Sequence, residues 1–318
     1  MSDLFDMDLD AGMAFLSKKE NKKNDGLLRL DPKTSKNPTT KGLRVVMRFL
    51  PNLSEDGKVG VAAIEKHVHY VKLPNHQHLV GYFDSMRNFN LPCDLTNTYW
   101  ELKNSKSVID NEKADLISRS TKYYSYVQIL EHETEPDLVG KIMIFPFGIK
   151  IKNKINEERT GEITGSQVNV YDLANGKDFI CIVKEIGGFA NYDSSMFKPL
   201  QTPIQIVAKD GSLKEVPTVD VNGRKAIDPK FQDKIKEYLL SREVALEDYA
   251  PVKWDEETRS KVNEIVSILK NSPVVAANKA ISNAKTGDDT FFEDDALPFG
   301  DNTTTPSSSK SEDDFFNF

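Results

Sequence analysis

The sequence predicts a mainly β protein of the α+β class, with its helices towards the C-terminal end. Between about residues 27 and 226, apolar side chains recur mostly at every second position, which is the period of a strand. Two segments with helical spacing follow. The chain has 318 residues, of which 38% are hydrophobic and 29% charged, and this composition is typical of a globular protein with a substantial core.

Composition divides the chain into three regions. Residues 1–26 hold a short apolar stripe at roughly helical spacing, followed by polar sequence, and we expect an N-terminal interaction arm there. Residues 27–272 form the predicted folded core, closed by Pro273. Residues 273–318 include "TTTPSSSKSEDD", which has too little apolar surface to offset its ordering entropy. We therefore expect a disordered acidic C-terminal tail.

The segment "GLRVVMRFLP" is the first predicted strand. Leu43, Val45 and Met47 alternate with Arg44 and Arg48, the pattern of a half-buried strand whose cations face outwards.

Two Gly-containing pairs predict hairpins further along. Asn175-Gly176 separates "VNVYDLA" from "KDFICIVKEI", and a two-residue type I′ loop requires positive φ at both positions. Asp210-Gly211 predicts a second hairpin. Gly187-Gly188 indicates a bend or bulge at a strand end, and it is weak evidence for phosphate binding.

Two amphipathic helices are expected after residue 228. Pro229 suits the start of the first helix, and Asp255 can cap the second. Their expected apolar stripes are Phe231, Ile235, Tyr238 and Leu239 in the first, and Val262, Ile265, Val266 and Leu269 in the second.

The termini and the cysteines predict a cytosolic protein. "MSDLFDMDLDAGMAF" carries acids where a secretory signal needs basic residues, and no apolar run approaches the roughly 18 residues of a membrane span. Two cysteines, Cys93 and Cys181, are too few for a disulfide framework and fit a reducing compartment.

The net charge of −7 is unevenly distributed. Residues 286–318 hold nine acids and one lysine, a local charge of −8, which leaves +1 for residues 1–285. The first ten residues add four aspartates, so residues 11–285 carry +5. A mildly basic body between acidic ends is compatible with a nucleic-acid partner.

Catalytic signatures are missing from the sequence. It contains no Walker A loop, no G-x-G-x-x-G after a strand, no G-x-S-x-G elbow and no H-E-x-x-H. The segment "HVHYVKLPNHQH" leaves one alternative, a metal-dependent nucleic-acid enzyme, although its spacing matches no standard zinc finger. The candidate metal ligands are His67, His69, His76, His78 and Cys93.

The segment "SRSTKYYSYVQIL" combines cations with tyrosines. Single-stranded nucleic acid is bound without sequence preference when bases stack on rings and cations follow the phosphates. Alternation places Lys122, Tyr124 and Tyr126 on one face, which suits a nucleic acid, and Tyr123 on the core face with Val127. The alternative is that these tyrosines are strand formers on a solvated sheet.

Three further stretches strengthen the nucleic-acid interpretation. "FPFGIKIKNKI" sets two phenylalanines before lysines at every second position, "GGFANYD" sets two rings in a Gly-rich loop, and the first strand supplies paired arginines. Besides Lys122 and the tyrosines above, the predicted DNA-binding residues are Arg44, Arg48, Arg119, Phe145, Phe147, Lys150, Lys152, Phe189 and Tyr192.

The tail combines acids with aromatic residues. Its acids can mimic phosphate in the binding groove, while phenylalanines after acidic clusters are typical of a peptide that docks on partner proteins. The predicted partner-binding residues are Asp294, Asp295, Pro298, Phe299, Asp313, Asp314, Phe315, Phe316 and Phe318.

Four motifs resemble, in order and spacing, the helix-destabilising single-stranded-DNA-binding protein of T-even-type tailed phages. They are "VVMRFLP", "RSTKYYSYVQIL", "GKIMIFPFGIKIKNKI" and "IGGFANYDSSMF". The resemblance implies an OB-fold core with added hairpins, cooperative binding of neighbouring copies along DNA, and a tail that contacts replication and recombination proteins. It also implies DNA-facing positions at Tyr123, Tyr124, Phe145, Phe189 and Tyr192, with Arg119 in the basic run. "DDALPF" is similar to the acidic peptide that ends bacterial single-stranded-DNA-binding proteins.

The sequence departs from the family in three places. The family's zinc subdomain uses one histidine and three cysteines, whereas "FNLPCDL" keeps only Cys93, with His67 as the matching histidine, so we expect no zinc cofactor. The N-terminus is acidic, and "KKENKK" is the nearest basic substitute. "PIQIVAKDGSLKEVPTVDVNGRK" is predicted to be an inserted hairpin.

The sequence thus predicts a non-enzymatic protein that coats and protects unpaired DNA during phage replication, recombination and repair in a bacterial cytoplasm, without a membrane partner. An RNA-binding regulator is the other alternative, because the same rings would serve it.

Overall fold

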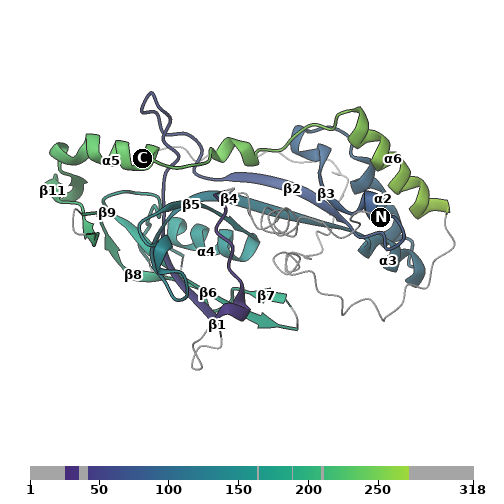
Figure 1. The fold of residues 1–318 in the computed structure, drawn as a ribbon, viewed down its shortest axis with the longest axis horizontal. Coiled ribbons are helices and arrows are strands. Elements are labelled where there is room, and N and C mark those ends of the chain that lie inside the picture. Colours follow the sequence, from purple (N-terminus) through teal and green to yellow (C-terminus); the bar gives the residue numbers. More distant parts are fainter. Residues whose placement is uncertain (1–25, 36–41, 163–164, 188, 209–210, 272–318) are drawn as a thin grey trace, which may run out of the picture.

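A computed structural model describes residues 26–35, 42–162, 165–187, 189–208 and 211–271 (Figure 1). Its centre is an eight-stranded antiparallel sheet in the order β3-β2-β4-β1-β6-β7, with β5 paired to β4 and β8 to β6. The strands are β1 (Gly42–Phe49), β2 (Ile64–Val71), β3 (Gly81–Asp84), β4 (Ile117–His132), β5 (Ile142–Phe147), β6 (Gly176–Ile186), β7 (Phe189–Asn191) and β8 (Met196–Thr202).

The long strand β4 connects two ends of the molecule. Figure 1 shows β2 and β4 running from the sheet to a group of helices, α2 (Asp94–Asn104), α3 (Val108–Asp115) and α6 (Glu256–Asn271). Ile117, at the start of β4, belongs to the core cluster under these helices, whereas Val127 and Ile129 belong to the main core of the sheet. The mainly β, α+β class is therefore confirmed. The sheet is open, and its description as an OB-fold stays a prediction.

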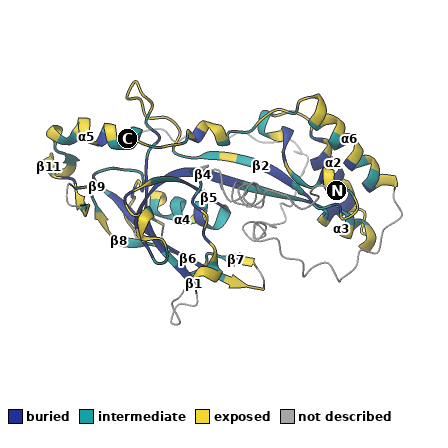
Figure 2. Cartoon of the chain, in the orientation of Figure 1, coloured by how far each residue is buried: buried dark blue, intermediate teal, exposed yellow. Residues whose placement is uncertain are grey.

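Strand β1 is buried on both faces (Figure 2). It lies between β4 and β6, so residues predicted to face outwards are covered. Val46 is 0% exposed and Arg48 1% exposed, and only Arg44 is half-buried. The prediction of a half-buried strand was wrong because alternation cannot reveal that a strand is central in its sheet.

Three helices occupy sequence predicted to be mostly strand. Two are α2 and α3, and the third is α4 (Ile149–Thr160), which replaces the strand expected to carry Lys150 and Lys152. The alternating isoleucines of "IKIKNKI" suggested period two, but Ile151 and Ile155, one helical turn apart, pack against the main core. Gly161 ends α4 with a φ of 68°, a left-handed cap that favours glycine.

Of the predicted hairpins, one is confirmed and one is wrong. β9 (Gln205–Val207) pairs with β10 (Leu213–Glu215), the two strands on either side of the predicted turn. Gly176 instead begins β6, where an added Cβ would lie 2.6 Å from the carbonyl oxygen of Asp172, so close backbone approach explains this glycine. The "inserted hairpin" is in fact two hairpins.

The second inserted hairpin joins β11 (Thr218–Val221) to β12 (Arg224–Ile227). Asn222 and Gly223 have φ values of 55° and 80°, the positive signs that a type I′ turn requires.

The two C-terminal helices are confirmed. A 3₁₀ turn (Pro229–Phe231) leads into α5 (Gln232–Leu240), which buries Ile235 and Leu239. The Asp255 carboxylate accepts a hydrogen bond from the backbone N–H of Thr258 (2.8 Å) at the start of α6, which buries Val262, Ile265 and Leu269. The other 3₁₀ turns are Pro32–Thr34, Gln77–Leu79, Met86–Phe89, Pro136–Leu138 and Leu246–Tyr249.

The predicted arm and the predicted tail lie outside the described residues, as does Pro273, and these predictions stand untested. Within the described part, each helix is too short or too polar to cross a membrane.

Candidate nucleic-acid interface

Three of the predicted DNA-binding rings are buried in the main core. Tyr123, Phe145 and Phe147 stack on one another, with ring centroids 5.6 Å apart for Tyr123–Phe147 and 5.7 Å for Phe145–Phe147. Phe145 is 0% exposed. A DNA base could stack on these three rings only if the core opened.

The even-numbered tyrosines of β4 are also covered. Tyr124 stacks on Tyr249 at 5.1 Å, and the Tyr126 hydroxyl donates to the carbonyl oxygen of Val244 (3.0 Å) and accepts from the N–H of Leu246 (2.6 Å). Alternation separated the two faces of β4 correctly. The even face, however, contacts residues 244–249 instead of solvent.

The β7 hairpin carries the most accessible predicted ring. β6 and β7 pair through Ile186 and Phe189, with Gly187 at a φ of 64° in the turn, so the predicted bend is confirmed at that residue. Phe189 is 44% exposed. Tyr192 packs against the main core, and burial raises its pKa well above the ordinary value.

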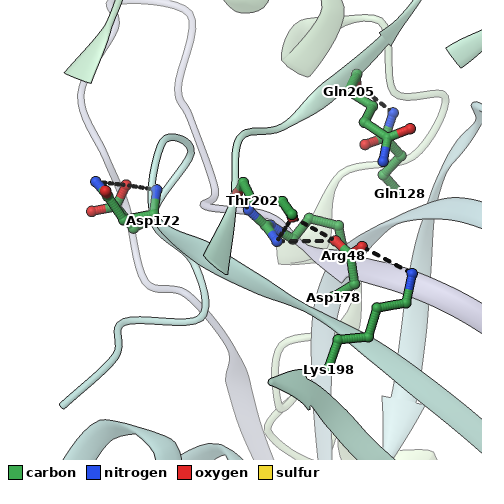
Figure 3. Close-up of polar contacts among 8 residues, drawn as sticks. Arg48, Gln128, Asp172, Asp178, Lys198, Thr202 and Gln205 are labelled. Atoms are coloured by element: carbon green, nitrogen blue, oxygen red, sulfur yellow. Dashed lines mark hydrogen bonds and ion pairs between the residues drawn. The ribbon is translucent and has the colours of Figure 1, made fainter. Parts of the chain in front are cut away.

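Two predicted cations are engaged in ion pairs within the fold. Arg44 Nη1 lies 2.5 Å from Glu131 Oε2 on the surface. Arg48 Nη1 lies 3.0 Å from Asp178 Oδ1 in the interior, and its Nη2 donates to the carbonyl oxygen of Thr202 (Figure 3). Burial lowers the Arg48 pKa, and Asp178 counteracts that shift. Arg48 therefore acts in this structure as a buried structural cation.

Helix α4 places its lysines beside the β7 hairpin. Lys150 Nζ lies 3.0 Å from Asp193 Oδ1, and Lys154 also interacts electrostatically with that carboxylate. In a helix, residues four apart share a face, so Lys150 and Lys154 lie together and Lys152 points elsewhere. One carboxylate next to two lysines leaves this corner of the molecule basic.

The odd face of the β2–β4 pair carries the predicted cation Arg119. We define it by Glu65, His67, Arg119, Thr121 and Tyr123, which face one another across the register His67↔Thr121 and Glu65↔Tyr123. His67 Nδ1 lies 2.9 Å from Thr121 Oγ1, and burial followed by the Arg119 charge lowers the His67 pKa. The half-buried Arg119 has an Nε that finds no hydrogen-bond partner among the described residues.

Buried rings of the main core link the odd face to the start of α4 and the β7 hairpin. Tyr123 stacks on Phe147, Gly148 then caps α4, and Lys150 pairs with Asp193 after β7. We define the track as Arg119 on the odd face, Lys150 and Lys154 on α4, and Phe189, the exposed ring of the β7 hairpin. Arg44 and Arg48 belong to other contacts.

Sequence reasoning missed a pair of tyrosines on the even face. Tyr70 and Tyr82 are cross-strand partners with ring centroids 4.6 Å apart. Lys122 Nζ lies 3.8 Å from the Tyr82 centroid and Lys72 Nζ 5.1 Å from that of Tyr70. Only the register of β2 and β3 reveals this pairing, because the tyrosines are twelve positions apart in the chain.

The histidines that the sequence left open as an alternative metal site are not gathered around one point in the described part of the chain. His67 contacts Thr121, His78 Nε2 lies 3.2 Å from Glu264 Oε1, and His69 is buried with Cys93. No group of three or more histidine, cysteine or acidic residues that could hold a metal is found within the described part of the chain.

Comparison with known proteins decides the family. The family model described as "gp32 DNA binding protein like" matches residues 42–258, more than half of the chain and every residue of the track. The chain belongs to this gp32-like family. The resemblance that the four motifs indicated is confirmed.

Two curated relatives of the gp32-like family are named single-stranded DNA-binding proteins. The protein of Enterobacteria phage T4 is 27% identical over 218 residues, covering 67% of this chain and 61% of the relative. That of Enterobacteria phage T2 is 32% identical over 97 residues, covering 30% of this chain and 32% of the relative. The matched regions thus span less than two thirds of either relative.

The zinc ligands that the gp32-like resemblance implies are not all present. The histidine packed with Cys93 is His69, whereas the sequence offered His67 as the match to the family's histidine. The side chains that form hydrogen bonds with Cys93 are His69, Thr96 and Ser85. Threonine and serine hydroxyls are not zinc ligands in proteins, so this donor set does not fit a tetrahedral zinc ion.

Proposed function

We propose that this protein binds single-stranded DNA without sequence preference and without catalysis, along the track from Arg119 to Phe189. The observation that carries the proposal is that the gp32-like family match includes the whole track, while both relatives are named as binding proteins for single-stranded DNA. The chemistry of the track suits that ligand.

Each part of the track has a distinct role in the proposal. Arg119 is a half-buried cation of the odd face, and its guanidinium can donate charge-assisted hydrogen bonds to a phosphate oxygen. Lys150 and Lys154 follow the next phosphates, with Asp193 as their exchangeable counter-ion. Phe189 presents an exposed ring on which a base can stack.

Binding of this kind destabilises duplex DNA by mass action. A protein that binds the unpaired state but not the duplex shifts the equilibrium towards single strands, and no nucleotide hydrolysis is needed. We propose that the protein thereby coats unpaired DNA during phage replication, recombination and repair in the cytoplasm of a bacterial host. Its acidic tail would recruit replication and recombination proteins, and neighbouring copies would bind side by side.

Salt-dependent titration of poly(dT) tests the proposal. Because phosphate contacts release counter-ions, log affinity falls with log salt at a slope of about −0.7 per neutralised phosphate. Arg119→Met should make that slope shallower by about 0.7, as one phosphate contact is lost. Arg44→Met is the matched control, since Arg44 is already paired with Glu131 and lies off the track.

Three outcomes would contradict the proposal. An affinity that does not depend on salt would show that the protein contacts no phosphates. An equal loss of slope in Arg119→Met and Arg44→Met would show that the track is not the binding site. Preference for an rU oligomer over a matched dT oligomer assigns the surface to RNA, because a contact with the 2′-hydroxyl is then required.

A further inference from the structure

Four polar side chains are buried together between the sheet and the helices at the α2 end. They are His69 on β2, Ser85 directly after β3, Cys93 at the cap of α2 and Thr96 in its first turn. All four lie among apolar residues such as Val71, Leu95 and Ile117. Burying polar groups costs free energy unless they are hydrogen-bonded, so their mutual contacts decide whether this end of the fold is stable.

The four side chains satisfy one another. His69 Nε2 lies 2.9 Å from Thr96 Oγ1, Ser85 Oγ lies 3.2 Å from the same hydroxyl, and Cys93 hydrogen-bonds with all three. We call these residues the polar tetrad.

His69 has the orientation of a metal-bound histidine. Its Nδ1 lies 3.3 Å from the carbonyl oxygen of Ile117, which can only accept, so Nδ1 is the donor. In the neutral ring, Nε2 is then the lone-pair nitrogen, and it faces the tetrad. Metal-ligating histidines use this arrangement, with the second nitrogen donating to a backbone carbonyl. Here the Thr96 hydroxyl stands where a ligated ion would be.

The spacing of Cys93 and Thr96 in the sequence also resembles that of zinc ligands. Cys93 and Thr96 are three residues apart, the spacing of C-x-x-C, with threonine at the second position. The tetrad has one histidine, as a one-histidine, three-cysteine zinc site has, but two of the three thiols are replaced by hydroxyls. Hydroxyls remain protonated at neutral pH, whereas zinc requires deprotonated ligands.

We infer that the polar tetrad is a metal-free replacement for a tetrahedral metal centre, and that the α2 end of this protein folds without zinc. The hydrogen bonds join β2, the end of β3 and α2, which are the elements that a metal would hold together. The inference concerns metal content and stability, so its outcome is independent of whether the track binds DNA.

Metal analysis of the full-length protein is the first test. Protein expressed with added zinc and purified without chelator should contain no stoichiometric zinc, and a chelator should leave its melting temperature unchanged. A single equivalent of tightly held zinc, or a fall in melting temperature with chelator, overturns the inference.

Restoring thiols is the second test. Ser85→Cys with Thr96→Cys should bind one equivalent of Co²⁺, with the visible absorption of tetrahedral cobalt thiolate, and should lose thermal stability when chelator removes the metal. Ser85→Cys with Thr98→Cys is the matched control, because Thr98 is buried in the same helix but lies outside the tetrad. A folded Thr96→Cys variant without that spectrum, or an equal spectrum from the control, overturns the inference.

A single substitution covers the case in which the double variant does not fold. Thr96→Val keeps the shape of the side chain but removes the hydroxyl that both His69 and Ser85 contact. Its melting temperature should fall equally with and without zinc in the buffer. Rescue of Thr96→Val by zinc, or an unchanged melting temperature, contradicts a role for the hydroxyl network.

Discussion

The exposed ring of Phe189 gives the sharpest test of the proposed track. Phe189 lies at the start of β7, pairs with Ile186 across the hairpin and leaves 44% of its surface accessible. Phe189→Ala removes a ring face without removing charge. Because the ring is not part of the buried core, we expect the variant to lose less stability than the about 3–5 kcal/mol typical of a buried phenylalanine.

The expected loss of affinity follows from stacking. Removing one aromatic platform costs about 1–3 kcal/mol per stacked base, which corresponds to an affinity for dT oligomers weaker by about 5- to 150-fold. The salt slope should stay unchanged, since no phosphate contact is lost. A weaker affinity with an unchanged slope thus separates stacking by Phe189 from the charge contacts of Arg119 and Lys150.

Fluorescence anisotropy with a labelled dT oligomer at several salt concentrations measures both quantities. Tyr82→Ala is the matched control, because Tyr82 is 46% exposed but belongs to the even face of the β2–β3–β4 sheet. Affinity of Phe189→Ala within twofold of wild type refutes the role of the ring. Equal losses in both variants refute the choice of face.

Three further predictions concern stability and the tail. Arg48→Met should cost about 3–5 kcal/mol of unfolding free energy in urea, because it removes the buried ion pair and leaves Asp178 with the more distant Lys198 and the Thr202 hydroxyl. Asp178→Leu in the same chain should recover part of that loss. Burial, and then the Lys66 charge, lower the Lys122 pKa to about 7. Between about pH 7 and 10 the unfolded chain therefore binds more protons than the folded chain, and the free energy of unfolding rises with pH. Lys122→Met should remove this pH dependence in urea titrations. Deleting residues 286–318 removes nine acids and one lysine and should tighten DNA binding, whereas unchanged affinity would exclude phosphate mimicry by the tail.

Local patterns predicted the parts of the fold that depend on neighbouring residues. The stripe of α6 and its Asp255 cap are properties of one segment, and both are confirmed. The alternation of β4 also separated its two faces, with Tyr123 in the main core and Tyr124 in another cluster. The error at α4 is also local, because "IKIKNKI" contains both a period of two and a pair of isoleucines one helical turn apart.

Long-range contacts explain what the sequence concealed at the candidate site. Tyr124 and Tyr126 are covered by residues 244–249, more than a hundred positions away, and no pattern within β4 records that cover. Arg48 is neutralised by Asp178 on a neighbouring strand, which only the β1–β6 register reveals. Basic and aromatic residues in a strand therefore indicated the family better than they indicated which side chains are exposed.

The polar tetrad and the proposed track meet on the same pair of strands. His69 and Arg119 are cross-strand partners, and His69 Nδ1 is hydrogen-bonded to the carbonyl oxygen of Ile117, two residues before Arg119. Side chains directly opposite in an antiparallel pair share a face, so the tetrad fixes the strand register that points Arg119 towards the track. The hydrogen bonds of the tetrad would therefore hold Arg119 in position. Substitutions that weaken these hydrogen bonds should weaken DNA binding through Arg119, although the tetrad residues themselves need not contact DNA.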